Sequence, residues 1–317
     1  MKKKVSPSLT KILTKCPKCG MPNNIAPMAL TLAQQPFNDK DWQFEIKWDG
    51  FRMVAYCSGG QVNLSSRRNN NFNKRFSSIK SELERLKLNA VLDGEVVIMN
   101  EDGLPNFSNI IATNQKGIAV FYVFDILWVN GRNVLDLPLF QRRKILKSLL
   151  GKSDIVRFSD DVAEKGIELF ELVEKHQVEG IVAKQRESVY SPGYRTNQWL
   201  KIKTGKQVEA VVAGYLFDQD KHGISSLIIG RKIDNKYKYI GLVEAGVGNL
   251  TMKKVYEATT TKRSIFSPVP IVNVKTPFRT PIKNVEIVWL NPLKCEVKYL
   301  ELDRFGMMRH ASFKGLL

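Results

Sequence analysis

The 317-residue sequence has little cysteine, few acidic side chains relative to basic ones, and no long apolar run. Four cysteines are too few for a disulfide scaffold of this size, and Cys57 and Cys295 stand alone in apolar, strand-like segments. We therefore expect buried thiols in a reducing compartment. A membrane-spanning helix needs about 18 consecutive apolar residues, and the sequence contains no such run.

The N-terminal segment also lacks the features of a secretion signal. Met1–Lys4 is basic, but Val5–Thr14 is interrupted by Pro, Ser and Lys. We expect an intracellular, cytoplasmic protein, associated with the nucleoid if it is bacterial. Cys16 and Cys19 resemble half of a zinc ribbon, but a structural zinc site needs four ligands and no second Cys or His pair lies nearby. Two free thiols in a turn are the simpler interpretation.

Basic side chains, by contrast, are abundant. Forty-nine Lys and Arg against 31 Asp and Glu leave a formal charge of +18, which predicts an extended anionic partner. Nucleic acid is the first candidate, and an anionic membrane is the alternative. The basic residues are spread along the chain instead of lying on one amphipathic helix, so we expect no membrane partner. A hydrophobic fraction of 43% is enough for two packed cores.

Residue patterning predicts an α+β first domain. The expected strands are Phe44–Trp48, Phe51–Cys57, Gln61–Ser66, Val91–Met99, Val120–Trp128, Gly180–Lys184 and Trp199–Lys203. The expected helices are Lys74–Lys87, Pro138–Leu150 and Asp160–His176. The last of these opens on acidic residues, which suit a helix N-terminus, and places His176 at its C-terminus. An Asn-rich loop is expected at Pro105–Lys116.

The pattern changes after the polar connector Thr204–Lys206. Short strands are expected at Val208–Phe217, Ser226–Arg231, Lys238–Val243, Val285–Leu290 and Glu296–Leu302, with one helix at Leu250–Thr261. This set suits a small barrel of the oligonucleotide-binding (OB) type. We therefore predict a lead-in at residues 1–28, a first domain at 29–204 and a barrel domain at 205–317, with a hinge at 204–206.

The stretch Glu45–Arg52 places Lys47 between an aliphatic residue and an Asp-Gly turn at the end of a predicted strand. Alone, such a lysine is a surface charge more often than a nucleophile. Five further stretches on or beside predicted strands change this interpretation: Leu64–Arg67, Leu92–Glu95, Tyr122–Asp125, Val178–Lys184 and Trp199–Lys203. Together they supply a lysine nucleophile, further cations, glutamates and an aromatic ring. These groups could bind a nucleoside triphosphate and attack its α-phosphorus.

Each group has a chemical reason to be there. Lys201, Lys203 and a bound divalent metal would favour a neutral, nucleophilic amine and neutralise phosphate charge. Carboxylates such as Glu95 and Glu179 suit Mg²⁺ or Mn²⁺, which are hard ions that prefer oxygen.

The nucleoside needs other contacts. The planar fork of Arg52 could bind ribose or a phosphate. Glu45 lies on the same strand face as Lys47 and could accept from the adenine amino group, favouring ATP over GTP. Phe124 could stack on adenine or could belong to the core.

In this order and spacing, the stretches resemble the collinear motifs of the covalent nucleotidyltransferases, the superfamily of ATP-dependent DNA ligases, RNA ligases and messenger RNA capping enzymes. The resemblance covers about residues 29–317. It is strongest to the ligase module of bacterial ATP-dependent end-joining DNA ligases, through Glu179–Lys184, Trp199–Lys203 and Arg309–Leu316. It implies an ATP-grasp-like nucleotidyltransferase (adenylation) domain followed by an OB-fold domain.

The resemblance also implies residue roles and a reaction. Lys47 would be the nucleophile, Arg52 a ribose contact and Arg67 a phosphate-positioning residue; Glu95 and Glu179 would bind metal and ribose, and Lys201 and Lys203 the α-phosphate. Lys47 would take AMP from ATP, pass it to the 5′-phosphate of nicked double-stranded DNA, and the 3′-hydroxyl would then displace AMP. We expect a monomer, with repair or end-joining proteins as partners.

Several alternatives stay open at this point. An RNA ligase or capping enzyme would prefer RNA ends or GTP, and a binding module would hold nicked duplex without chemistry. Asp93 and Asp125 could each cap a turn or hold a basic neighbour, and Lys184 could bind phosphate or be a solvated strand end.

The end of the sequence departs from the family pattern. In the family, Phe-Lys-Gly-Leu continues into Arg-x-Asp-Lys, which is thought to orient the pyrophosphate, whereas this sequence stops at Leu317. Either the sequence is part of a longer chain or the protein works without that motif. We expect weak self-adenylylation, with joining of a pre-adenylylated nick preserved.

Overall fold

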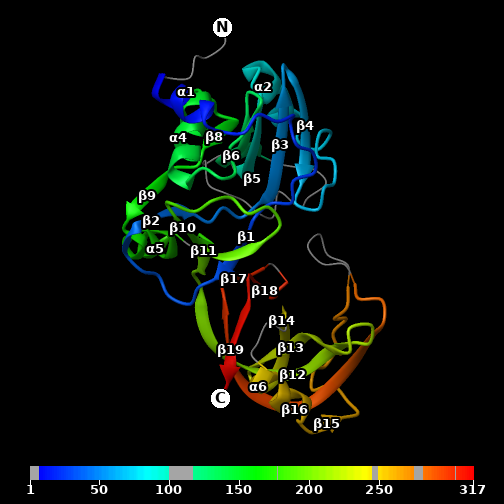
Figure 1. Cartoon of the computed structure of the whole chain (residues 1–317). Helices are drawn as coiled ribbons and strands as arrows, with labels where there is room; N and C mark the ends of the chain where they lie inside the picture. The colour runs from blue at the N-terminus through cyan, green and yellow to red at the C-terminus, as the bar shows by residue number, and fades with distance from the viewer. Residues whose placement is uncertain (1–6, 100–116, 177, 245–248, 275–280, 304) are drawn as a thin grey trace. The chain divides into compact units, whose positions relative to one another are not determined.

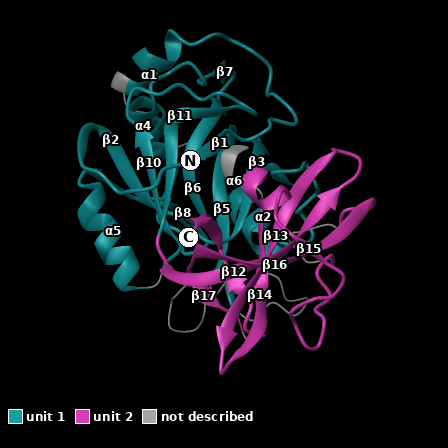
Figure 2. Cartoon of the chain, turned by 90° about the horizontal axis from the view of Figure 1, so that it is seen from below, with its two compact units in different colours: residues 1–203 teal, residues 204–317 magenta. Residues whose placement is uncertain are grey.

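The structure is a computed structural model that describes the chain except for residues 1–6, 100–116, 177, 245–248, 275–280 and 304. The expected Asn-rich loop at Pro105–Lys116 therefore lies outside the described residues. Contacts divide the chain into two compact units, Met1–Lys203 and Thr204–Leu317, which Figure 2 colours teal and magenta. In the described part of the chain, no helix is long and apolar enough to cross a bilayer.

The first unit contains a six-stranded sheet with the order β4-β3-β5-β6-β7, in which β8 pairs with β6 (Figure 1). Its strands are β3 (Phe51–Ser58), β4 (Gln61–Ser66), β5 (Ala90–Met99), β6 (Ile118–Val129), β7 (Arg132–Asn133) and β8 (Val156–Phe158). All neighbours are antiparallel except β6 and β8. Helices α1 (Pro7–Thr14), α2 (Ser77–Leu86) and α4 (Leu139–Leu149) pack their apolar residues on this sheet to form one core. The N-terminal segment contributes Leu9, Leu13 and Cys16 to that core.

A second, five-stranded sheet of the same unit has the order β1-β11-β10-β2-β9. Its strands are β1 (Ala29–Leu32), β2 (Asp39–Ile46), β9 (Asp161–Glu164), β10 (Gly180–Gln185) and β11 (Arg195–Lys203). Helix α5 (Gly166–Lys175) covers one face, where Leu169, Phe170 and Val173 pack with Phe44 and Ile181. Strand β10 lies between β11 and β2, which explains why its sequence is almost continuously apolar.

The second unit is a curled antiparallel sheet with the order β14-β13-β12-β16-β15, in which β19 pairs with β16. The strands are β12 (Lys206–Asp218), β13 (Gly223–Ile233), β14 (Lys236–Glu244), β15 (Thr260–Thr261), β16 (Val285–Tyr299) and β19 (Ser312–Leu316). Helix α6 spans Asn249–Tyr256, and β17 (Glu301–Leu302) and β18 (Met308–Arg309) form a small ribbon. The register of β12 shifts at Val212–Gly214 against both of its neighbours, and such bulges let a sheet curl around its core.

Three sequence-based predictions of secondary structure are wrong. The helix expected at Leu250–Thr261 ends at Tyr256, and Thr260–Thr261 form the strand β15. The expected helix Asp160–His176 begins only at Gly166, because Asp161–Glu164 form the edge strand β9 on β2; His176 is its C-cap residue, as predicted. The two strands expected at Val285–Leu290 and Glu296–Leu302 are one strand, β16. The break suggested by Pro292 is absorbed where the pairing with β12 shifts from Trp289 to Leu293.

The predicted buried thiols are confirmed. Cys57 and Cys295 are free and buried. Of the N-terminal pair, Cys16 is buried and Cys19 is exposed, and both are free.

Candidate active site

Lys47 lies one residue beyond the end of β2, where its N–H donates to the carbonyl of Gly180 at 2.9 Å. Its ammonium group donates to a carboxylate oxygen of Glu179, a buried residue just before β10. The ammonium of Lys203, at the end of β11, lies 4.0 Å from the other oxygen of Glu179. The segments predicted to carry the nucleophile, the metal ligand and an α-phosphate contact therefore meet at this carboxylate.

Glycine is required at position 180 for this arrangement. Its φ is +150°, and an added Cβ would lie 2.1 Å from the carbonyl oxygen of Ile202 on the neighbouring strand. No larger residue fits without separating β10 from β11. The Glu-Gly pair thus places Glu179 between Lys47 and Lys203.

A cavity opens beside Lys47 between the two sheets of the first unit. It is lined by Leu30, Glu45, Ile46, Lys47, Trp48, Arg52, Glu95, Phe124, Val182, Lys184 and Trp199. Five predicted site residues, Glu45, Lys47, Arg52, Glu95 and Phe124, therefore share one cavity. Trp48 stacks on Tyr122 of β6 with ring centroids 3.9 Å apart, which holds the turn after Lys47 against the other sheet.

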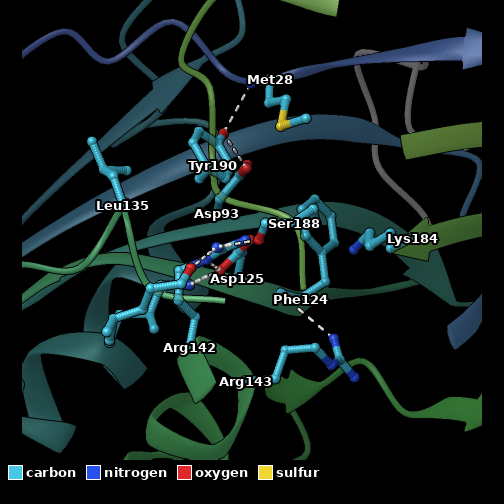
Figure 3. Close-up of polar contacts among 12 residues, drawn as sticks. Met28, Asp93, Phe124, Asp125, Leu135, Arg142, Arg143, Lys184, Ser188 and Tyr190 are labelled. Carbon is cyan, nitrogen blue, oxygen red and sulfur yellow. Dashed lines mark hydrogen bonds and ion pairs between the residues drawn. The ribbon is translucent and has the colours of Figure 1, made fainter. Parts of the chain in front are cut away.

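Arg52 is held by Asp93. Its Nε and Nη2 atoms each donate to a carboxylate oxygen of Asp93 at 2.6 Å, and the hydroxyl of Tyr190 donates to the same carboxylate at 2.6 Å. Asp93 is fully buried, and Figure 3 shows it beside Tyr190. The interpretation of Asp93 as the holder of a basic neighbour is confirmed. Asp125 has the same task, because both of its oxygens accept from Arg142 at 2.9 Å.

Glu95 pairs across the sheet with Arg52 and also faces the cavity. Burial raises the pKa of Glu95 to about 8, although the charges of Arg52 and Lys47 oppose the shift and Glu179 adds to it. Two carboxylates that disfavour each other's charge form a suitable site for a divalent cation, which would relieve the repulsion.

Phe124 is buried, with two cations beside its ring. The guanidinium of Arg52 lies 4.5 Å from the ring centroid and the ammonium of Lys184 lies 4.1 Å from it. Stacking of adenine on Phe124 remains a prediction, and a stacked base would have to replace one of these cations.

Lys184 is not a solvated strand end. Its side chain is buried, its ammonium donates to Glu45 at 2.9 Å, and it lies 4.4 Å from the ring centroid of Trp199. Figure 3 shows Lys184 beside the ring of Phe124. Burial lowers the pKa of Lys184, and the ion pair with Glu45 opposes that shift. The nearest charged partner of Lys184 in the cavity is a carboxylate, so the structure gives no support to the phosphate-binding alternative.

The remaining predicted residues lie away from the lining of the cavity. Lys201 is half-buried on β11, and burial together with the charges of Lys203 and Lys47 lowers its pKa to about 8. Arg67 is exposed in the turn after β4. The structure therefore brings Lys201 into the electrostatic environment of Lys47 and Lys203 but does not bring Arg67 to the cavity.

Sequence analysis missed Arg142, Arg143 and Tyr190. The two arginines are buried on α4, and Arg143 donates to Glu45 at 3.1 Å and to Asp161 at 2.6 Å. No local signal marked them, because charged residues in an amphipathic helix ordinarily face solvent.

Comparisons with known proteins identify the family of the chain. A family model described as "ATP dependent DNA ligase domain" matches residues 7–203, and one described as "ATP dependent DNA ligase C terminal region" matches residues 220–316. The chain belongs to the ATP-dependent DNA ligase family.

The chain is 30% identical over 307 residues to the multifunctional non-homologous end joining protein LigD of Mycolicibacterium smegmatis, covering 94% of this chain and 39% of that protein. It is 27% identical over 297 residues to the SPbeta prophage-derived DNA ligase-like protein LigB of Bacillus subtilis, covering 92% of this chain and 98% of that protein. The solved ligase domain of M. tuberculosis LigD superposes with a TM-score of 0.55 at 28% identity, covering 92% of this chain and 95% of that chain. The chain thus spans about two fifths of the length of the LigD proteins that it matches.

These matches confirm the predicted resemblance to bacterial end-joining ligases. They also confirm the predicted fold class, a nucleotidyltransferase domain followed by an OB-fold domain.

Proposed function

We propose that this protein is an ATP-dependent DNA ligase that seals 5′-phosphate/3′-hydroxyl nicks through a lysyl-AMP on Lys47 and a DNA-adenylate. The observation that carries the proposal is the position of Lys47. Its ammonium contacts the buried Glu179, and the same lysine lines a cavity that Glu45, Arg52, Glu95 and Phe124 also line. An amine with these neighbours suits attack on the α-phosphorus of ATP.

In the first step, Nζ of Lys47 forms a bond to the α-phosphorus, the bond to the β-phosphate oxygen breaks, and pyrophosphate leaves. Glu179 already accepts a hydrogen bond from this amine and is positioned to take its proton. The ammonium of Lys203, and Lys201 nearby on β11, would stabilise the negative charge on the phosphate oxygens.

Glu95 and Glu179 fit a divalent metal ion. Both present carboxylate oxygens, and the charge of Glu179 adds to the rise in the pKa of Glu95, as expected where a cation would be stabilising. Bound there, Mg²⁺ or Mn²⁺ would neutralise phosphate charge. Arg52, fixed by Asp93, would present its remaining donors to ribose.

The later steps need DNA. AMP would pass from Lys47 to the 5′-phosphate of a nick, and the 3′-hydroxyl would displace it, closing the phosphodiester. A net charge of +18 supports sequence-independent binding of nicked duplex through its phosphates. The M. smegmatis relative is named for non-homologous end joining, which supports a role in end joining or repair with partner proteins.

The test is transfer of label from ATP labelled at the α-phosphate. With Mg²⁺ we expect a covalent AMP adduct on Lys47, located by mass spectrometry, that is absent in Lys47→Ala and can be chased onto nicked DNA. Sealing of a pre-adenylylated nick is measured alongside, so that loss of self-adenylylation can be distinguished from loss of joining. Preference for GTP or RNA nicks would instead identify an RNA ligase or capping enzyme, and nick binding with neither adduct nor sealing would identify a binding module.

A further inference from the structure

The two halves of the expected base site come from different sheets. Glu45, which would accept from the adenine amino group, lies on β2 of the five-stranded sheet. Phe124, on which adenine would stack, lies on β6 of the six-stranded sheet. We call the Glu45 carboxylate and the Phe124 ring, with the cavity they line, the base subsite. Its dimensions depend on how the two sheets are held together.

One guanidinium bonds to both halves. Nη1 of Arg143 donates to the Glu45 carboxylate at 3.1 Å and to the Phe124 carbonyl at 3.0 Å; Figure 3 shows the second of these. Nη2 donates at 2.6 Å both to the Ser159 carbonyl and to the carboxylate of Asp161, on the edge strand next to Glu45. Arg143 is buried on α4 and is not part of the cavity lining.

We propose that Arg143 is a positioning residue that sets the preference of the base subsite for adenine. It holds the Glu45 carboxylate in a fixed orientation and at a fixed separation from Phe124. A carboxylate held in this way accepts a hydrogen bond from an exocyclic amino group. It repels a carbonyl oxygen at the same position of the base. The inference rests on the proposed function, because it concerns the nucleotide that Lys47 attacks.

Lys184 also binds Glu45, through its ammonium at 2.9 Å. It lines the cavity and contacts the Phe124 ring, so substituting Lys184 would change the surface that the base itself touches. Arg143 is not part of that lining, and two of the groups to which it bonds, Glu45 and Phe124, are. Arg143 is therefore the residue to test.

The neighbouring Arg142 provides a matched control. It is also buried on α4 and also makes four hydrogen bonds, to Asp125, Leu137 and Ser188. None of these bonds reaches Glu45. Arg142→Met therefore removes an equally buried, equally bonded guanidinium that does not contact Glu45. It leaves Asp125, the neighbour of Phe124, without its ion-pair partner, so both variants are first compared by denaturant unfolding.

The experiment measures kcat/KM for attachment of the nucleoside monophosphate to Lys47. The substrates are ATP, GTP and purine riboside triphosphate, which is ATP without its 6-amino group. The quantity of interest is the preference for ATP over purine riboside triphosphate. We expect this preference to be about 10-fold to 100-fold in the unmodified protein, as for a hydrogen bond to a charged acceptor. It should fall at least about 10-fold in Arg143→Met, mainly through KM for ATP, and stay unchanged in Arg142→Met.

Arg143→Lys is measured in parallel, because it keeps a cation beside Glu45 and removes less packing. It should retain part of the preference. The inference is overturned if both Arg143 variants lose activity equally with ATP and with purine riboside triphosphate. It is also overturned if Arg142→Met reduces the preference as much as Arg143→Met. Absence of any adduct in the unmodified protein would instead contradict the proposed function itself.

Discussion

Glu179 accepts a hydrogen bond from the ammonium of Lys47, a residue 132 positions earlier in the sequence. The same carboxylate lies 4.0 Å from the ammonium of Lys203. One buried anion therefore organises the proposed nucleophile and a proposed phosphate ligand. A divalent cation bound beside this carboxylate would disfavour the ammonium form of Lys47 and so favour the neutral amine that attacks.

Replacing Glu179 by Gln should therefore reduce adenylylation more than ATP binding. The amide keeps the shape but removes the charge that holds a metal and accepts the amine proton. We expect adduct formation on Lys47 to fall about 100-fold or more at saturating ATP and Mg²⁺. Single-turnover labelling measures this rate, and Glu174→Gln on the exposed face of α5 is the control. A rate within about two-fold of the unmodified protein would refute the assigned role of Glu179.

ATP affinity should decrease above pH 8. Burial and the charges of Lys203 and Lys47 lower the pKa of Lys201 to about 8, so this side chain loses its positive charge as the pH rises through that value. Binding is best measured in Lys47→Arg, which keeps the neighbouring charge but cannot form the adduct. In that background Lys201→Arg stays charged and should bind ATP with little dependence on pH. Identical pH curves for the two proteins would contradict the prediction.

The lowered pKa of Lys201 also predicts how the free energy of unfolding depends on pH. The unfolded lysine keeps its proton up to about its ordinary value of 10.5, whereas the folded one loses it near 8. At Lys201 the unfolded state therefore binds more protons between these values, and the contribution of this side chain to stability should rise with pH across that window. Below pH 8 the half-buried ammonium of Lys201 destabilises the folded state by an amount that no longer changes with pH. Lys201→Met should remove this slope, which denaturant unfolding at a series of pH values would reveal.

Gly94→Ala should destabilise the first unit and reduce adenylylation. A Cβ at position 94 would lie 2.4 Å from the Tyr122 carbonyl oxygen and 2.5 Å from the Phe121 ring, so β5 and β6 would have to separate. We expect a loss of about 1–3 kcal/mol from overpacking, measured by urea unfolding. Glu95, the next residue, would move with the strand. Gly20→Ala, where a Cβ meets nothing within 4 Å, should change neither quantity.

Asp125→Asn should be among the most destabilising charge-neutralising changes in the first unit. The Asp125–Arg142 pair is fully buried, so removing one charge leaves the other without compensation. We expect a loss of about 3–5 kcal/mol in the free energy of unfolding. Asp154→Asn, which breaks the exposed pair with Arg157, should cost less than about 1 kcal/mol. If the two variants lost similar amounts of the free energy of unfolding, burial would not be the cause of the large loss in Asp125→Asn.

The sequence allowed the strands around the site to be predicted, because each motif lies on a segment with strong apolar patterning. Glu95 illustrates this: its strand was predicted at Val91–Met99 and lies at Ala90–Met99. The burial of Lys184 could not be predicted in this way. The residues next to Lys184 in the sequence do not indicate that β10 lies between β2 and β11. These two strands come from the beginning and the end of the sequence of the first unit.

Predictions from local rules failed where distant pairing decided the outcome. Asp161 follows the rule that acidic residues favour a helix N-terminus, yet it pairs with Glu45 in the sheet and binds Arg143. Arg143 itself lies in a correctly predicted helix. Its partner Glu45 is 98 positions away, so its role was visible only in three dimensions.

The order of the strands has a consequence for synthesis of the chain. Among the described strands, β2, which leads into Lys47, pairs with β9 and β10, and both are made more than a hundred residues later. Such non-local pairing delays folding, because a long loop must close before any contact forms. A nascent chain would acquire the ability to hold a nucleotide only after β11 has emerged from the ribosome. Binding of a nucleotide by the nascent chain would then indicate that the whole first unit has been synthesised and folded.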